Sequence, residues 1–154
     1  MAGRNSTGMF RSFTYEKTVE EIKVAMKAKI EQLQAKMAER KTRISRVREE
    51  FSITDSELID LLTQAANQAV SNRMVQSMSY SISQGGAEER LIGAGTVQNL
   101  ITEKTLIEEE AASVAQLERI RRNLRPVTVF NADGTTYQDN TVSLNESELD
   151  FLGL

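Results

Sequence analysis

Arginine side chains are the residues of this sequence best suited to chemistry, and they gather in two places. The segment 40–48 carries five basic side chains in nine positions, which are Arg40, Lys41, Arg43, Arg46 and Arg48. A second group follows near position 120 and consists of Arg119, Arg121, Arg122 and Arg125. Guanidinium groups bind phosphate through paired, charge-assisted hydrogen bonds. Recognition of nucleic acid or of another phosphate is therefore the chemistry that these groups could perform.

The first basic group flanks an apolar seam instead of forming a separate face. On a helical wheel its charges fall on both sides of the seam that Ile44, Val47 and Phe51 form, and Arg40 lies within the seam. Aliphatic stems can cover such a seam while the charged heads stay in water. Cations in the last turns also suit the helix dipole. The pattern is typical of a solvated helix end, and a phosphate-binding surface is the alternative.

The second basic group forms a cleaner face, because most of its arginines lie opposite the apolar side chains around Ile120. It also occupies the last turn of a predicted helix, where cations are favourable. No aromatic residues alternate with either group, so stacking on bases has no support. A nucleic-acid-associated regulator therefore remains an alternative hypothesis, with phosphate contacts from Arg43, Arg46, Arg119, Arg122 and Arg125.

Catalytic and metal-binding chemistry has little support in this composition. The chain contains no His and no Cys, so the commonest group for proton transfer near neutral pH and the thiolate nucleophile are both missing. The consecutive Glu108, Glu109 and Glu110 would fan out by about 100° each on a helix and would not converge on a metal ion. The loop around Asp133 lacks the residue order of an EF-hand. We expect no catalytic residues, no cofactor and no bound metal.

One long amphipathic helix is expected over residues 15–51, where apolar residues recur at steps of three and four. Several of them also follow an eleven-residue spacing, which predicts a nearly straight or slightly right-handed coil. Such a helix would be roughly 55 Å long, which exceeds the diameter of about 40 Å of a compact globule of this size. We therefore expect other subunits to cover its apolar stripe, through Val19, Ile22, Met26, Ile30, Leu33, Met37 and Ile44.

Two more helices follow in the predicted bundle. The capping box TDSE at 54–57 starts a helix expected over 55–80. Its inner face would carry Leu58, Leu61, Leu62, Ala65, Ala69, Val70, Met74 and Met78. Glycines within 81–95 predict a flexible link. A third helix is expected over 96–124, and Pro126 stops it.

The C-terminal part changes character to short strands. Alternating strand formers on both sides of Asp133 and Gly134 predict a β-hairpin, and residues 141–144 could add a third strand. A second capping box, NESE at 145–148, predicts a last helical turn. An isolated hairpin is marginal in water, so it should pack on the helices or join sheets of other subunits. The tail could dock in a groove on another molecule or cover its own bundle, using Leu149, Phe151, Leu152 and Leu154.

These elements predict a mainly α fold, a long-helix bundle of three helices that resembles a coiled coil, with a small C-terminal β-hairpin. We expect a flexible arm over 1–14, the helical domain over 15–125, and the hairpin and tail over 126–154. No apolar run approaches the roughly 20 residues that span a bilayer. We therefore expect no membrane contact, and a location in the cytoplasm or within a virus particle.

Charge is distributed unevenly, with a balance of +5 over residues 1–50 and −8 over residues 51–154. Such asymmetry favours head-to-tail contacts between chains or contact between the two ends of one chain, and an uneven distribution without functional meaning is the alternative. Our first hypothesis is a non-enzymatic structural or assembly subunit that forms a homo-oligomer through its long helix and terminal arms. It would belong to a cage, ring, filament or virus particle. A helical adaptor or chaperone for a partner protein is a further alternative.

Overall fold

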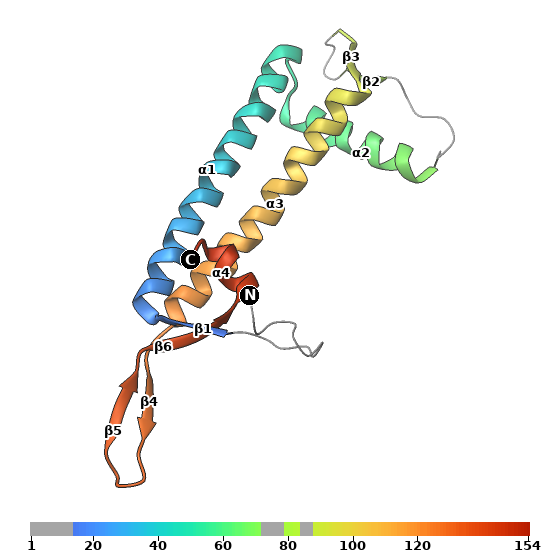
Figure 1. Cartoon of the computed structure of the whole chain (residues 1–154). Coiled ribbons are helices and arrows are strands. Elements are labelled where there is room, and N and C mark those ends of the chain that lie inside the picture. The colour runs from blue at the N-terminus through green and yellow to red at the C-terminus, as the bar shows by residue number, and fades with distance from the viewer. Residues whose placement is uncertain (1–13, 72–78, 84–87) are drawn as a thin grey trace, which may run out of the picture. The chain divides into compact units, whose positions relative to one another are not determined.

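The computed structural model describes residues 14–71, 79–83 and 88–154, and these residues are mainly helical. Within them lie four helices and three antiparallel strand pairs. In chain order, as Figure 1 shows, the elements are β1 (Thr14–Thr18), α1 (Val19–Phe51), α2 (Asp55–Ser71), β2 (Ser79–Ile82), β3 (Arg90–Gly93), α3 (Ala94–Asn123), β4 (Val127–Phe130), β5 (Thr136–Asp139), β6 (Thr141–Asn145) and α4 (Glu146–Leu152). The mainly helical class with a C-terminal hairpin is confirmed.

The chain divides into two compact units, and the two long helices contribute to both of them. The terminal unit consists of Met1–Leu33 with Ser113–Leu154, and the central unit consists of Gln34–Ala112. The expected arm lies outside the described residues, except for Thr14. No helix in the described part of the chain is long and apolar enough to cross a membrane.

Helix α1 begins four residues later than expected, because residues 14–18 pair with β6. The register runs from Thr14 opposite Asn145 to Thr18 opposite Thr141. A capping box then starts the helix. The Thr18 hydroxyl accepts from the Glu21 backbone N–H at 3.1 Å, and the Glu21 carboxylate accepts from the Thr18 backbone N–H at 3.2 Å. The helix predicted from residue 15 was therefore wrong over 15–18.

The central unit has a core of buried aliphatic side chains from the α1–α2 connection, α2, β2, β3 and α3, which are Ile53, Leu61, Ala65, Ile82, Ile92, Val97 and Leu100. Helix α2 starts at the predicted capping box, because the Thr54 hydroxyl accepts from the Glu57 backbone N–H at 3.2 Å. The prediction that it continues to residue 80 was wrong, since 79–82 pair with 90–93. This pairing buries one face of the short sheet, and it replaces part of the expected link. Met74, Met78 and residues 84–87 lie outside the described ranges.

The C-terminal elements agree with the predicted strands and differ in one pairing. Strands β4 and β5 pair with each other, with Val127 opposite Asp139 and Phe130 opposite Thr136. Strand β6 exists as expected but pairs with β1 instead of extending the hairpin. The predicted capping box starts α4 at Asn145. The β4–β5 hairpin is therefore a two-stranded sheet with two unpaired edges.

Candidate functional site

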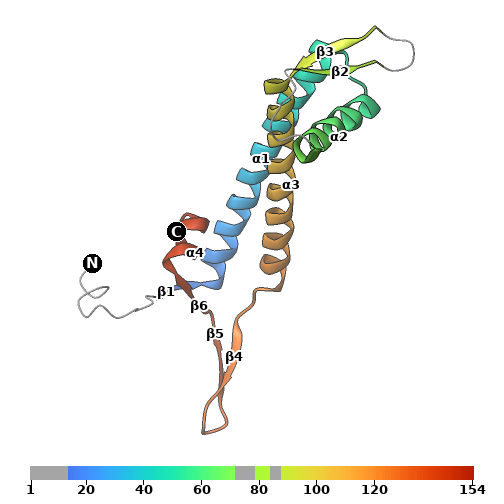
Figure 2. The ribbon, with the colours of Figure 1, turned by 90° about the vertical axis from the view of Figure 1, so that its right-hand side faces the viewer.

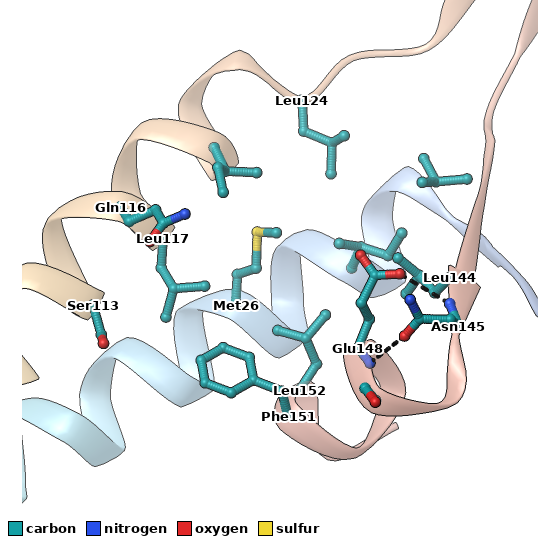
Figure 3. A pocket seen from close by; sticks show the side chains of 14 residues that line it. Met26, Ser113, Gln116, Leu117, Leu124, Leu144, Asn145, Glu148, Phe151 and Leu152 are labelled. Carbon is teal, nitrogen blue, oxygen red and sulfur yellow. Dashed lines mark hydrogen bonds between the residues drawn. The ribbon is translucent and has the colours of Figure 1, made fainter.

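The terminal unit contains an apolar groove with a volume of about 550 Å³, drawn in Figure 3. Its walls come from α1, α3, β6 and α4, and most of its lining side chains are aliphatic: Ile22, Met26, Leu117, Ile120, Leu124, Val142, Leu144 and Leu152. In Figure 3, Met26, Leu117 and Leu152 converge from three different helices. The polar Asn145 and Glu148 bond each other's backbone N–H, both at 2.9 Å. The groove therefore offers mainly hydrocarbon to a ligand.

Three contacts, two of them to backbone carbonyls, position the walls of this groove. The Val19 backbone N–H donates to the Asn140 carbonyl at 2.8 Å, which fixes the start of α1 against the chain entering β6. Arg121 of α3 donates from Nε to the Lys23 carbonyl of α1 at 3.2 Å. The Lys29 ammonium lies 4.9 Å from the centroid of the Phe151 ring, which is within the range of a cation–π contact. These contacts hold α1, α3 and α4 around one apolar space.

The β4–β5 hairpin is the second feature of the terminal unit that is suited to binding. Figures 1 and 2 both show it extending from the end of α3 away from α4. Three large side chains on it are strongly exposed, with Val127 at 63%, Phe130 at 77% and Tyr137 at 51%. Cross-strand neighbours share a face, so Val129 and Tyr137 lie together on one face and Phe130 lies on the other. Both faces of the hairpin are therefore partly apolar and open to a partner.

The tip of this hairpin is ordered and negatively charged. Asp133 accepts from the Thr135 hydroxyl at 2.6 Å and from the Thr135 backbone N–H at 2.9 Å. These bonds lower the pKa of Asp133 below its ordinary value. Hydrogen bonds from the Thr141 hydroxyl and backbone N–H likewise lower the pKa of Asp139. Residues 127–154 contain five carboxylate side chains and no Lys or Arg, so this end of the chain is acidic.

The structure places most of the predicted self-association stripe inside the chain. The terminal-unit members of the stripe are buried, and they are Val19, Ile22, Met26, Ile30 and Leu33. Met37 and Ile44 are half-buried, and Ile44 packs against the core of the central unit. The folded chain therefore covers much of the stripe that we expected other subunits to cover.

Two of the four predicted docking residues of the tail line the chain's own groove. Leu149 is buried, and Leu152 lines the groove. Phe151 also lines the groove and remains partly exposed. Leu154 is partly exposed as well. The Leu154 backbone N–H donates to the Leu149 carbonyl at 2.9 Å, which closes the last turn. The tail thus forms one wall of the groove.

The basic run on α1 faces glutamates of α3 within the central unit. Arg40 forms an ion pair with Glu110 at 2.8 Å and lies 3.5 Å from Glu103. Arg43 pairs with Glu103 at 3.2 Å. A second pocket, of about 510 Å³, is lined by Arg43, Arg46 and Glu103 among others. A phosphate entering that pocket would meet the Glu103 carboxylate, so the run is poorly suited to phosphate.

The remaining predicted phosphate ligands lie at the end of α3, with Arg119 and Arg122 in its last turns and Arg125 just after it, and we call them the basic face of α3. Arg119, Arg122 and Arg125 are all exposed, and none forms an ion pair with a carboxylate of the described residues. Their role as phosphate ligands stays a prediction. Sequence reasoning missed the partners of Arg40, although Glu103 and Glu110 lie seven residues apart, which is two turns of one helix face.

The described residues contain no cluster of three or more His, Cys, Asp or Glu side chains that could hold a metal ion. What they do contain is an apolar groove, an apolar hairpin and one unpaired basic face, all of them suited to binding a macromolecule. No protein-family model, no curated protein and no solved structure significantly matches the chain.

Proposed function

We propose that the protein is a non-enzymatic structural or assembly subunit that associates with copies of itself in a cage, ring, filament or virus particle. The observation that carries this proposal is the β4–β5 hairpin, on which Val127, Phe130 and Tyr137 are exposed. A two-stranded hairpin without further packing is marginal in water. Its unpaired edges are also templates for pairing with another chain. A partner that covers the hairpin would remove both liabilities.

We propose associating surfaces other than the stripe of α1. The stripe of α1 from Val19 to Leu33 is already buried, so we propose the hairpin and the groove as the associating surfaces. The opposite charges of the two parts of the sequence support contacts between unlike surfaces of neighbouring copies. We still propose that the long helices of several copies pack together, but only through the half-buried Met37 and Ile44.

Light scattering after size exclusion, at 50 and 500 mM salt and over a range of protein concentrations, tests the proposal. We expect a defined oligomer whose apparent dissociation constant rises on the order of tenfold or more when Phe130 and Tyr137 are both replaced by Ser. Val24→Ser is the matched control, because Val24 is an exposed apolar side chain on α1. A wild-type monomer under all conditions, or a hairpin variant that assembles like the wild type, would contradict the proposal.

A nucleic-acid-associated regulator is the second candidate function, and one observation favours it. Arg119, Arg122 and Arg125 present three exposed guanidinium groups at the end of α3 without an acidic partner among the described residues. Three such groups could contact the backbone phosphates of a duplex. The Arg43–Glu103 ion pair removes one of the other expected contacts, so this candidate now depends on the α3 face.

A further inference from the structure

We propose that the β4–β5 hairpin of one copy inserts into the terminal-unit groove of the next copy, so that the protein assembles head to tail. This inference rests on the proposed self-association and names the two surfaces that meet. Both surfaces belong to the terminal unit, and both are apolar. The occupant of the groove is therefore a second copy of this chain.

The apolar content of the two surfaces matches. The groove is walled by aliphatic side chains from three helices and β6, and the hairpin carries exposed Val127, Phe130 and Tyr137. Burial of a Tyr requires a partner for its hydroxyl. Ser113 and Gln116 both line the groove and could provide one. Insertion would thus remove apolar surface from water on both sides without leaving the hydroxyl unpaired.

One arginine near the α3 wall of the groove has a charge opposite to that of the hairpin. The hairpin carries Asp133 and Asp139, whose hydrogen bonds favour the ionised form. The α3 wall contributes Gln116 and Ile120 to the groove, and the exposed Arg119 lies about 60° of helix rotation from Gln116, at the rim. The α4 wall carries Glu148 instead. We therefore place the acidic hairpin against the α3 wall, where unlike charges would meet.

The geometry of the hairpin favours insertion into another copy over insertion into its own groove. Its first strand follows Pro126, whose ring restricts the backbone at the root. Its second strand leads through Asn140, whose carbonyl accepts from the Val19 backbone N–H, directly into β6. Figures 1 and 2 show the hairpin leaving this root in the direction away from α4. To reach its own groove, the hairpin would have to reverse over two short connections.

A hairpin in a neighbour's groove is a heterologous contact, because each copy uses two different surfaces. Repetition of such a contact gives a ring where the rotation closes and a filament where it does not. Each end copy of an open assembly would still carry one free hairpin or one free groove. This property separates the proposal from pairing of two hairpins, in which both copies use the same surface.

Mixing two assembly-deficient variants tests the proposal. The hairpin variant carries Phe130→Ser and Tyr137→Ser and keeps its groove, and the groove variant carries Ile120→Glu and keeps its hairpin. Ile120 is partly exposed, so the substitution should leave the fold intact. Circular dichroism checks this, with Leu124→Ser as the replacement if it fails. We expect each variant alone to be monomeric at a concentration where wild type assembles, and the equimolar mixture to form a heterodimer.

Each other result has a defined meaning. If wild type assembles and the mixture forms no heterodimer, the hairpin-in-groove contact is wrong while self-association stands. If the groove variant assembles like wild type, the groove is not part of the interface. If removal of residues 1–13 abolishes assembly and the hairpin variant still assembles, the N-terminal segment occupies the groove instead. A wild type that never assembles contradicts the proposed function itself.

Discussion

Arg90 of β3 and Glu57 of α2 form an ion pair inside the central unit. The Glu57 side chain is only 2% exposed, and its carboxylate also accepts from the Thr54 backbone N–H at 3.0 Å. The same guanidinium donates to the backbone carbonyls of Phe51 at 3.1 Å and Ser52 at 2.5 Å. One side chain therefore joins the end of α1, the start of α2 and the β2–β3 pair.

Replacing Arg90 by Met should destabilise the central unit. The substitution leaves the Glu57 carboxylate buried without its charged partner. A buried charge without a partner destabilises the fold more than replacement of both residues by apolar ones would. We expect the melting temperature to fall by on the order of 5–10 °C. Arg90→Lys should recover little, because a single ammonium cannot reproduce the planar fork. Arg46→Met, at an exposed position of the same unit, is the control and should stay within about 2 °C of wild type.

Glu57 should also make stability depend on pH. The hydrogen bond from the Thr54 backbone N–H, followed by the Arg90 contact, lowers the pKa of Glu57 below its ordinary value of 4.5. A carboxylate whose pKa is lower in the folded state stabilises that state above the unfolded pKa, and this contribution is lost as the pH falls through the folded pKa. Glu57→Gln keeps a capping side chain and removes the charge.

Thermal melts of wild type and Glu57→Gln between pH 3 and pH 7 measure this contribution. We expect wild type to be more stable at pH 7, and the difference between the two proteins to shrink as the pH falls below about 4.5. Comparison with the variant is necessary because the pKa values of Asp133 and Asp139 are lowered as well. A difference in stability that stays constant over this pH range would show that the charge of Glu57 does not contribute, and that only its packing and hydrogen bonds do.

Local signals predicted several of the helix boundaries of this fold. The capping boxes at 54–57 and 145–148 both form in the structure, and the predicted stop near Pro126 agrees with the end of α3. A third box at 18–21 was present in the sequence and was not used. It would have placed the start of α1 correctly. These features depend on residues three positions apart, which is why a sequence shows them.

Pairings between distant residues were not predictable from the same signals. Strand β1 is short and polar, and only its pairing with β6, more than 120 residues away, makes it a strand. Arg90 and Glu57 are 33 residues apart, and no periodicity connects them. The groove draws its walls from four elements. The stripe of α1 was recognised as apolar, and its burial within the folded chain was missed because helix packing partners have no local signature.

The Arg40–Glu110 pair should contribute more to stability than the neighbouring Arg43–Glu103 pair. Arg40 donates from Nε and Nη2 to the two oxygens of Glu110 at 2.8 and 3.3 Å, and both side chains are mostly buried. Arg43 makes a single contact at 3.2 Å and is about half exposed. We expect Arg40→Gln to lower the melting temperature by on the order of 5 °C, and Arg43→Gln by about 1 °C.

A double-mutant cycle assigns the first effect to the pair. Arg40→Gln, Glu110→Gln and the double variant are melted at 50 and 500 mM salt. The loss in the double variant should be smaller than the sum of the single losses, because the second substitution no longer breaks an intact pair. Salt should reduce the effect at the exposed Arg43 more than the effect at Arg40. Additive losses would mean that the two groups act independently.

Ile22 and Val24 distinguish a core position of α1 from a surface position. Ile22 is 1% exposed and lines the groove floor, whereas Val24 is 67% exposed. Ile22→Ala should lower the free energy of unfolding by about 2–4 kcal/mol. Val24→Ala should leave it unchanged or raise it slightly, because Ala is the better helix former. Urea unfolding measures both. If Ile22→Ala changed the mass in solution without changing stability, the residue would belong to a subunit interface.

The basic face of α3 gives a direct test of the nucleic-acid candidate. That candidate predicts that wild type binds a fluorescent DNA duplex at 50 mM salt. Replacing Arg119, Arg122 and Arg125 by Gln should then remove about three phosphate contacts, and should lower the slope of log K against log salt by about 2.7. The control is Arg40→Gln with Arg43→Gln, because both arginines are already paired with glutamates.

The two variants separate specific phosphate contacts from a general charge effect. If both weakened duplex binding equally, net charge alone would account for it, since the control removes only one charge fewer than the α3 variant. If wild type did not bind at 50 mM salt, the candidate would be wrong, and the exposed arginines would be left as the complement of the acidic hairpin. In that case the α3 variant should weaken self-association instead, because Asp133 and Asp139 of the neighbouring copy would lose their opposite charges.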